Sequence, residues 1–154
     1  MKFAKGGFKN IYAVRMEPGE DVMLSLQKFC EDNGIGHGVI LSGIGSLSGC
    51  SYFDPEKLPG KPGLYGYGDP IELPCPIELI SMGGIICTDQ EGKVSLHVHA
   101  SFADEHGKGF GGHFKEGNHV LTTVEMIIGE LEHIQMSRAI DPSRGVPVFT
   151  PIQQ

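Results

Sequence analysis

Three histidines lie within residues 93–113, the stretch KVSLHVHASFADEHGKGFGGH. His97 and His99 are separated by a single residue, and His113 follows later in the same stretch. Alternate side chains of a β-strand point to the same face, so imidazoles at i and i+2 can bind one metal ion. A third imidazole from beyond the next turn completes a three-histidine set and leaves one coordination position open. The spacing therefore predicts a metal site formed by His97, His99 and His113.

The strand that carries the first two histidines is predicted to have one polar and one apolar face. The polar face holds the two histidines, and the opposite face is suited to packing: Leu96, Val98, Ala100 and Phe102. Gly111 and Gly112 precede His113 and suit a tight backbone path into the site. A histidine pair on a polar strand face is by itself often a surface feature. The later histidine makes a metal site the better interpretation.

Three neutral imidazoles suit Zn²⁺ best among the common divalent ions, and iron, nickel and cobalt accept the same ligands. The open position would hold a water molecule of lowered pKa or a substrate oxygen. The remaining histidines lack such spacing: His37, His106, His119 and His133. We expect His106 to be exposed in a turn, and His37 and His119 to begin strands near the rim of the site.

Glu125 stands inside the otherwise apolar segment TTVEMII. A buried carboxylate is costly unless it is paired, bound to a metal or protonated. One interpretation makes Glu125 a catalytic general acid or base, or a carboxylate that supports the metal site. The other makes it a buried ion pair with Arg15 or Arg138, or an exposed residue at a sheet edge. The sequence leaves both open, and Glu78 raises the same question more weakly.

The composition indicates one domain without a basic surface. The chain has 154 residues and a formal net charge of −7, which disfavours a protein whose main task is to neutralise phosphates. Its 23 glycines and 10 prolines imply many tight turns and favour a β-rich fold. The four cysteines form no CxxC pair, and the sequence has no apolar signal peptide or membrane span. We therefore expect a soluble protein of the reduced cytoplasm.

One helix is predicted between Pro18 and Gly34. Acidic residues lie in its first turn, where the helix dipole favours negative charge. Apolar residues recur at the spacing of one buried stripe: Val22, Leu26, Phe29 and Cys30. A helix with a single apolar stripe is expected to lie across one face of a sheet.

The rest of the domain is predicted to be mainly strands, which lie within residues 11–15, 37–54, 71–87, 93–103, 119–131 and 133–140. Gly43, Gly45 and Gly49 favour a bulge over a ligand-binding loop, because GIGSLS lacks the pattern of a phosphate-binding loop. Residues 55–70 are rich in Pro and Gly and are expected to form a surface excursion. Its Tyr65 and Tyr67 either edge a pocket or pack the loop itself.

These elements predict three parts of the chain. Residues 1–10 carry lysines without acids and are expected to form a flexible basic arm. Residues 11–141 form the single domain. Residues 142–154 have the proline spacing of an irregular C-terminal tail.

The chain resembles the PPC domain, a domain conserved in plants and prokaryotes that accompanies AT-hook motifs in plant proteins. The resemblance covers about residues 11–140. It rests on GIGSLS, on ELISMGGII, on LHVHASFAD followed by GKGFGGH, and on TTVEMII, which occur in the family's order. Each motif alone is weak, and their order makes them specific.

The resemblance implies an α+β fold with a curved, mainly antiparallel sheet and one principal helix, assembled into a homotrimer. In bacterial members the corresponding histidines look like zinc ligands, which implies the same role for His97, His99 and His113. The histidine arrangement is also similar to that of acetolactate decarboxylase, a zinc enzyme with a related sheet. That similarity supports metal chemistry without supplying a substrate.

Three functions follow from these observations. The first is a zinc protein whose open metal position binds a small anionic or carbonyl ligand, with decarboxylase-like or lyase chemistry if Glu125 moves a proton. The second is a DNA-associated regulatory protein with a structural metal, although the chain lacks the Arg-Gly-Arg of an AT-hook and is acidic. The third is an assembly module without catalysis.

Overall fold

The structure is a computed structural model that describes residues 1–59, 64–143 and 145–154. Its elements, in chain order, are β1 (Gly7–Met16), α1 (Val22–Asp32), β2 (Gly38–Leu47), β3 (Cys50–Phe53), β4 (Pro55–Lys57), β5 (Tyr65–Tyr67), β6 (Ile71–Leu73), β7 (Ile77–Thr88), β8 (Val94–Ala103), β9 (Gly109–Phe114), β10 (Val120–Glu132), β11 (Ile134–Ile140) and β12 (Pro147–Gln153). Part of the predicted excursion at 55–70, residues 60–63, lies outside the described residues.

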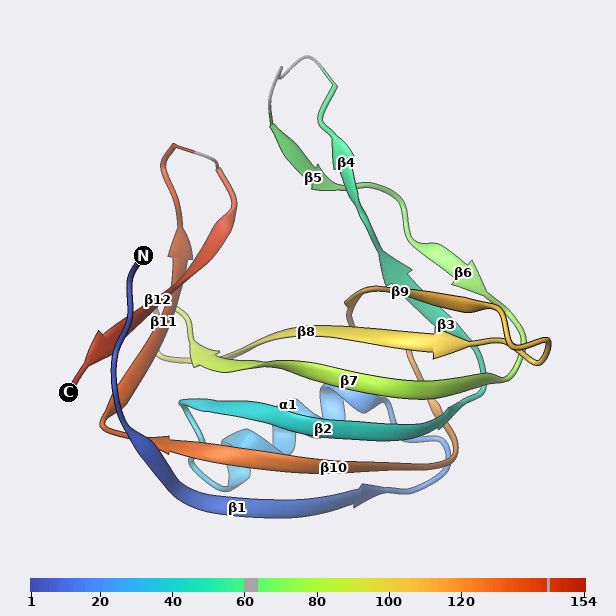
Figure 1. Cartoon of the computed structure of the whole chain (residues 1–154), viewed down its shortest axis with the longest axis horizontal. Helices are drawn as coiled ribbons and strands as arrows, with labels where there is room; N and C mark the ends of the chain where they lie inside the picture. Colours follow the sequence, from blue (N-terminus) through green and yellow to red (C-terminus); the bar gives the residue numbers. More distant parts are fainter. Residues whose placement is uncertain (60–63, 144) are drawn as a thin grey trace.

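One large sheet dominates the fold, as Figure 1 shows. Its strand order is β1-β10-β2-β7-β8-β9-β3-β6, and every neighbouring pair along this path is antiparallel. Strand β11 leaves this path, pairs with β12 and touches β7 through one parallel pair, Ser137 with Thr88. The α+β class and the mainly antiparallel sheet are therefore confirmed.

Helix α1 covers one face of this sheet (Figure 1). It begins after Asp21, whose Oδ1 accepts hydrogen bonds from the amides of Met23 and Leu24. It ends at Asn33, followed by Gly34 with a φ of 68°. The predicted helix is confirmed, but its start is set by the Asp21 cap and not by Pro18.

The hydrophobic core lies between α1 and the inner face of the sheet. The largest fully buried side chains come from the helix and from strands spread across the sheet: Leu26, Leu47, Ile77, Leu79, Met82, Ile86, Phe102, Phe114, Met126 and Ile128. On β8, Val98, Ala100 and Phe102 are buried, whereas His99 on the opposite face is exposed. The predicted division of this strand into a packing face and a polar face is confirmed.

The boundaries predicted for the first segment of the chain are wrong. Strand β1 begins at Gly7 rather than Ile11 and pairs with the end of β10, Gly7 lying opposite Glu132. Lys9 and Asn10 both bind the carboxylate of Glu130. Lys9, one of the basic residues of this segment, therefore forms an ion pair within the fold.

The irregular tail predicted at 142–154 is also wrong. Residues Pro147–Gln153 form β12, which pairs along its length with β11. Prolines lack an N–H and are therefore tolerated in a strand at a sheet edge, where one side of the backbone is unpaired. Within the described residues, no helix is both long and apolar enough to cross a membrane.

Candidate metal centre

Adjacent strands β8 and β9 bring the three predicted histidines together. His99 lies directly opposite His113 in the β8–β9 register, and His97 lies two residues before His99 on the same face. One ligand atom from each of the three side chains lies within 4.8 Å of the other two. The convergence that the spacing predicts is therefore present.

The distances between the ring nitrogens suit a small metal ion. The Nε2 atoms of His97 and His99 are 3.2 Å apart. Two imidazole nitrogens bound to one tetrahedral Zn²⁺ at about 2.0–2.1 Å lie about 3.3 Å from each other. The two side chains are thus already close to the separation that a shared ion requires.

His113 is the buried member of the set, with an exposed fraction of 5%. Its Nδ1 is buried and finds no hydrogen-bond partner among the described residues. Tyr67 of β5 stacks on the imidazole with 4.4 Å between ring centroids. A buried ring nitrogen without a partner is costly unless another group binds in the site, so the residues present fit a metal ion.

The electrostatic surroundings keep these rings neutral. Burial, and then the neighbouring His97 and His99, lower the pKa of His113 to about 4. Burial, followed by the guanidinium of Arg138 and by His99, lowers the pKa of His97 below its ordinary value. Neutral imidazole is the form that coordinates metals, and these two rings are held in it at neutral pH.

The two glycines before His113 allow neighbouring strands to approach closely, as predicted. A Cβ on Gly111 would lie 2.8 Å from the carbonyl oxygen of Ala100 on β8. A Cβ on Gly112 would lie 2.7 Å from the carbonyl oxygen of Phe53 on β3. Side chains at these positions would push β9 away from its neighbours and shift His113.

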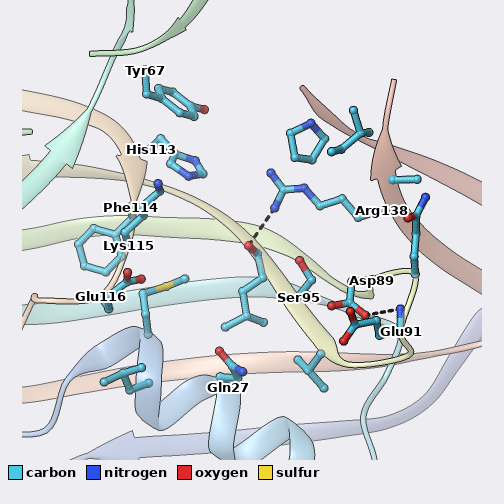
Figure 2. A pocket seen from close by; sticks show the side chains of 18 residues that line it. Gln27, Tyr67, Asp89, Glu91, Ser95, His113, Phe114, Lys115, Glu116 and Arg138 are labelled. Carbon is cyan, nitrogen blue, oxygen red and sulfur yellow. Dashed lines mark hydrogen bonds between the residues drawn. The ribbon is translucent and has the colours of Figure 1, made fainter. Parts of the chain in front are cut away.

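An open groove of about 670 Å³ begins at His113 and runs beside β8 toward α1. His113 and Tyr67 line one end of it, and Arg138 of β11 reaches into the same end from the opposite side (Figure 2). Leu96, next to His97, also lines the groove. The groove therefore gives a small molecule access to His113 from solvent.

Glu125 does not lie with the histidines within one chain. Strands β2 and β7 separate β10 from β8 in the sheet. Of the alternatives that the sequence left open, exposure is the one found, although β10 is not an edge strand: Glu125 is exposed on the sheet face opposite α1, beside Arg15 of β1 and Ile44 of β2. Arg15 forms its ion pair with Glu17 instead. Apolar neighbours in sequence did not imply burial, because this outer face is itself partly apolar.

The remaining histidines stay away from the cluster. His106 is exposed in the turn before β9, as expected. The Nδ1 atom of His37 accepts a hydrogen bond from the amide of Met136, and His119 forms an isolated bridge with Asp21 near the start of α1. Both serve the fold rather than the rim of the site.

Two residues at the site differ in how well the sequence predicted them. Tyr67 was expected either to edge a pocket or to pack its loop, and its stacking on His113 confirms the first. For Arg138, the sequence indicates only a possible ion pair with Glu125. Its place in the groove depends on how β11 packs beside β7, a long-range contact without a local sequence signal.

The chain matches a known domain family and shares its fold with solved structures. The family model described as the Plants and Prokaryotes Conserved (PCC) domain matches residues 3–132. Two curated relatives, bifunctional GlmU proteins from two Synechococcus strains, are 27% and 28% identical over 139 residues. The match covers 90% of this chain and 20% of each relative, so the chain spans about a fifth of their length.

Solved structures share the whole fold. A plant- and prokaryote-conserved (PPC) protein from Pyrococcus horikoshii is 27% identical, with a TM-score of 0.82 and complete coverage of both chains. A metal-containing protein from Archaeoglobus fulgidus is 25% identical, with a TM-score of 0.80 over 97% of this chain and 99% of that one. A candidate DNA-binding protein from Ralstonia eutropha JMP134 is 25% identical, with a TM-score of 0.75 over 97% and 93%.

Proposed function

The chain belongs to the Plants and Prokaryotes Conserved (PCC) domain family, and from this premise we propose that it is a zinc-binding protein that holds a small ligand at an open metal position. His97, His99 and His113 would supply the three protein ligands. The observation that carries the proposal is the convergence of three imidazoles, one of which, His113, has a buried ring nitrogen that no described residue satisfies. The metal-containing relative from Archaeoglobus fulgidus supports it.

Zn²⁺ is the favoured ion because three neutral imidazoles and one open position are a common zinc arrangement, in which the ion polarises a bound oxygen. The protein's own contribution would be to hold His97 and His113 neutral and to orient His113. Burial keeps the His113 ring neutral, and the stacked Tyr67 helps to orient it. The groove that begins at His113 would admit the ligand.

Elemental analysis of tag-free purified protein tests the metal. We expect about one transition metal ion per chain, mainly zinc, and a near-complete loss of metal in His97→Ala, because two remaining histidines bind zinc far more weakly. His106→Ala, which removes an exposed histidine outside the cluster, is the matched control and should keep its metal. Metal content near zero in the unaltered protein, even after incubation with zinc, would overturn the site.

We also propose that the protein assembles as a homotrimer through the sheet face opposite α1. That face carries exposed apolar side chains on three adjacent strands, Ile11, Ile44 and Ile127. Such an apolar surface on a single domain usually marks an interface. A general acid or base role for Glu125 at the metal would then require assembly, since within one chain two strands lie between them.

A DNA-associated role is the alternative, favoured by the description of the Ralstonia eutropha relative. The net charge of −7 and the use of Lys9 in an ion pair with Glu130 both oppose it. Fluorescence anisotropy with duplex DNA separates the two functions. Phosphate binding would weaken steeply between low and physiological salt, whereas ligand binding at the metal would change little.

A further inference from the structure

Arg138 belongs to a part of the chain that the family match does not include. The match ends at residue 132, and Arg138 lies on β11, in the hairpin that β11 forms with β12. The neighbouring Ser137 pairs with Thr88 of β7 and so fixes this hairpin beside the sheet. A role for Arg138 therefore does not follow from membership of the family and has to be argued from its surroundings.

The guanidinium of Arg138 is held at the edge of the metal centre. Its Nη1 donates a hydrogen bond to the carbonyl oxygen of Leu96, at 3.2 Å, one residue before His97. The side chain is half-buried and lines the same end of the groove as Tyr67 and His113. In Figure 2 the guanidinium points across the groove toward these two residues from the opposite wall.

This positive charge is not neutralised within the described residues, where Arg138 forms no ion pair. Three acids line the groove, Asp89, Glu91 and Glu116, and none of them forms an ion pair with Arg138. Two of the three are held within their own turn. Asp89 Oδ1 accepts hydrogen bonds from the amides of Glu91 and Lys93, and the Glu91 carboxylate pairs with Lys93 Nζ at 2.8 Å. A half-buried guanidinium without a paired carboxylate creates a positive potential that an anion would relieve.

We propose that Arg138 binds the carboxylate of a small ligand whose second oxygen, a carbonyl or hydroxyl, reaches the metal at the three histidines. A guanidinium presents several N–H donors in a planar fork that matches a carboxylate. The bond from Nη1 to Leu96 fixes the fork and leaves its other donors free for the ligand. The inference rests on the proposed function and narrows its ligand to a carboxylic acid with a nearby oxygen.

Co²⁺-loaded protein offers a direct test, because the visible absorption of cobalt reports a ligand that enters its coordination sphere. Pyruvate is the probe, and acetone, which has the carbonyl without the carboxylate, is its control. We expect Arg138→Gln to raise the Kd for pyruvate by about 10- to 100-fold, the loss of a charge-assisted hydrogen bond, without changing the weak response to acetone. Arg138→Lys should recover part of the affinity.

Lys28→Gln is the control, because Lys28 is an exposed cation on α1 that pairs with Asp32 and does not line the groove. It should bind pyruvate like the unaltered protein. Metal content and circular dichroism of each variant show whether its fold and metal site are intact. An unchanged Kd in Arg138→Gln with metal retained would overturn the inference while leaving the metal site standing.

The same substitution decides the inference even if no metal binds. In that case the proposed function fails, and pyruvate is titrated into the metal-free protein while the amide resonances of Leu96 and Arg138 are followed. Shifts that disappear in Arg138→Gln support a carboxylate site at this guanidinium. Shifts that persist in the variant, or the absence of any shift in the unaltered protein, overturn it.

Discussion

Glu130 is a buried carboxylate, 7% exposed, with three donors around it. Lys9 Nζ binds Oε1 at 2.8 Å, and Asn10 Nδ2 and the Tyr12 hydroxyl donate to Oε2 at 2.7 and 3.2 Å. Burial raises its pKa, but these three hydrogen bonds and the charge of Lys9 outweigh burial and hold the pKa below its ordinary value of 4.5. The ionised carboxylate therefore ties the start of β1 to β10.

Glu130→Gln tests this contact through the pH dependence of stability. A carboxyl whose pKa is depressed by folding stabilises the protein above the unfolded pKa, and this contribution disappears as the pH falls through the folded value. We expect Glu130→Gln to lower the free energy of unfolding by about 1.5–3 kcal/mol at pH 7, the range for hydrogen bonds to a charged group. Urea unfolding at pH 7 and at pH 3 measures it.

The difference between the variant and the unaltered protein should shrink as the pH falls from 7 to 3, because the unfolded chain becomes protonated at Glu130 first and the folded chain follows at lower pH. Glu132→Gln, at an exposed carboxylate two residues further on, is the control and should change stability little at either pH. A Glu130→Gln deficit that is equally large at both pH values would show that packing, and not the charge, is responsible.

The buried carboxylate of β10 is Glu130 and not Glu125, for which the sequence raised the question of burial. Val124, Met126 and Ile128 are buried, and Glu130 follows them on the same face, whereas Glu125 has the opposite parity. Strand alternation alone could have separated the two. The apolar Ile127 on the outer face obscured that alternation and made the whole segment look buried. By contrast, the spacing of the three histidines was sufficient, because two share one strand and the third lies on its neighbour.

Strand β9 determines how precisely His113 is placed. It is a short strand between β8 and β3, and its glycines remove the side chains that would keep these strands apart. A Cβ on Gly112 would come within 2.7 Å of both the Phe53 carbonyl oxygen and the ring of Tyr52, and within 2.8 Å of Asp54 Oδ1. Backbone and buried ring atoms of β3 cannot move away cheaply.

Gly112→Ala should therefore destabilise the protein and loosen the metal site together. We expect a loss of about 1–3 kcal/mol, typical of an overpacked position, measured by denaturant unfolding of the metal-free protein. Zinc affinity, measured by competition with a chromophoric chelator, should fall as well because His113 shifts. Gly109→Ala in the same strand, where the nearest atom lies 4.0 Å from a Cβ, is the control and should leave both properties nearly unchanged.

Local sequence patterns predicted the helix and the long strands. The remaining strands depend on which segments pair with each other. Strand β12 was missed because Pro147 and Pro151 resemble the punctuation of an irregular tail. Both nonetheless align with β11, opposite Ile140 and Met136, in a strand whose other side is unpaired along the described chain. Whether a proline-containing segment pairs at an edge depends on a partner strand, which composition alone does not reveal.

As a whole, the molecule is an open sheet with one covered and one uncovered face. Helix α1 and the core lie on one side (Figure 1). On the other side, Ile44 and Ile127 are 50% and 37% exposed and flank Glu125 and Arg15 in adjacent strands. The resemblance to the family implied a trimer, and the apolar outer face gives that implication a physical basis, since further copies of this chain would remove it from water.

Ile44→Lys tests assembly without undermining the single chain. The ammonium introduced by this substitution would lie opposite Glu125 in the β2–β10 register, where an opposite charge is favourable. Buried in an interface between copies, the same charge would be costly.

We expect the unaltered protein to have three times the 16.6 kDa mass of one chain by light scattering after gel filtration, and Ile44→Lys to approach the mass of one chain. Leu24→Lys, at an exposed residue of α1, should assemble normally. Equal masses for Ile44→Lys and the unaltered protein would show that this face is not the interface.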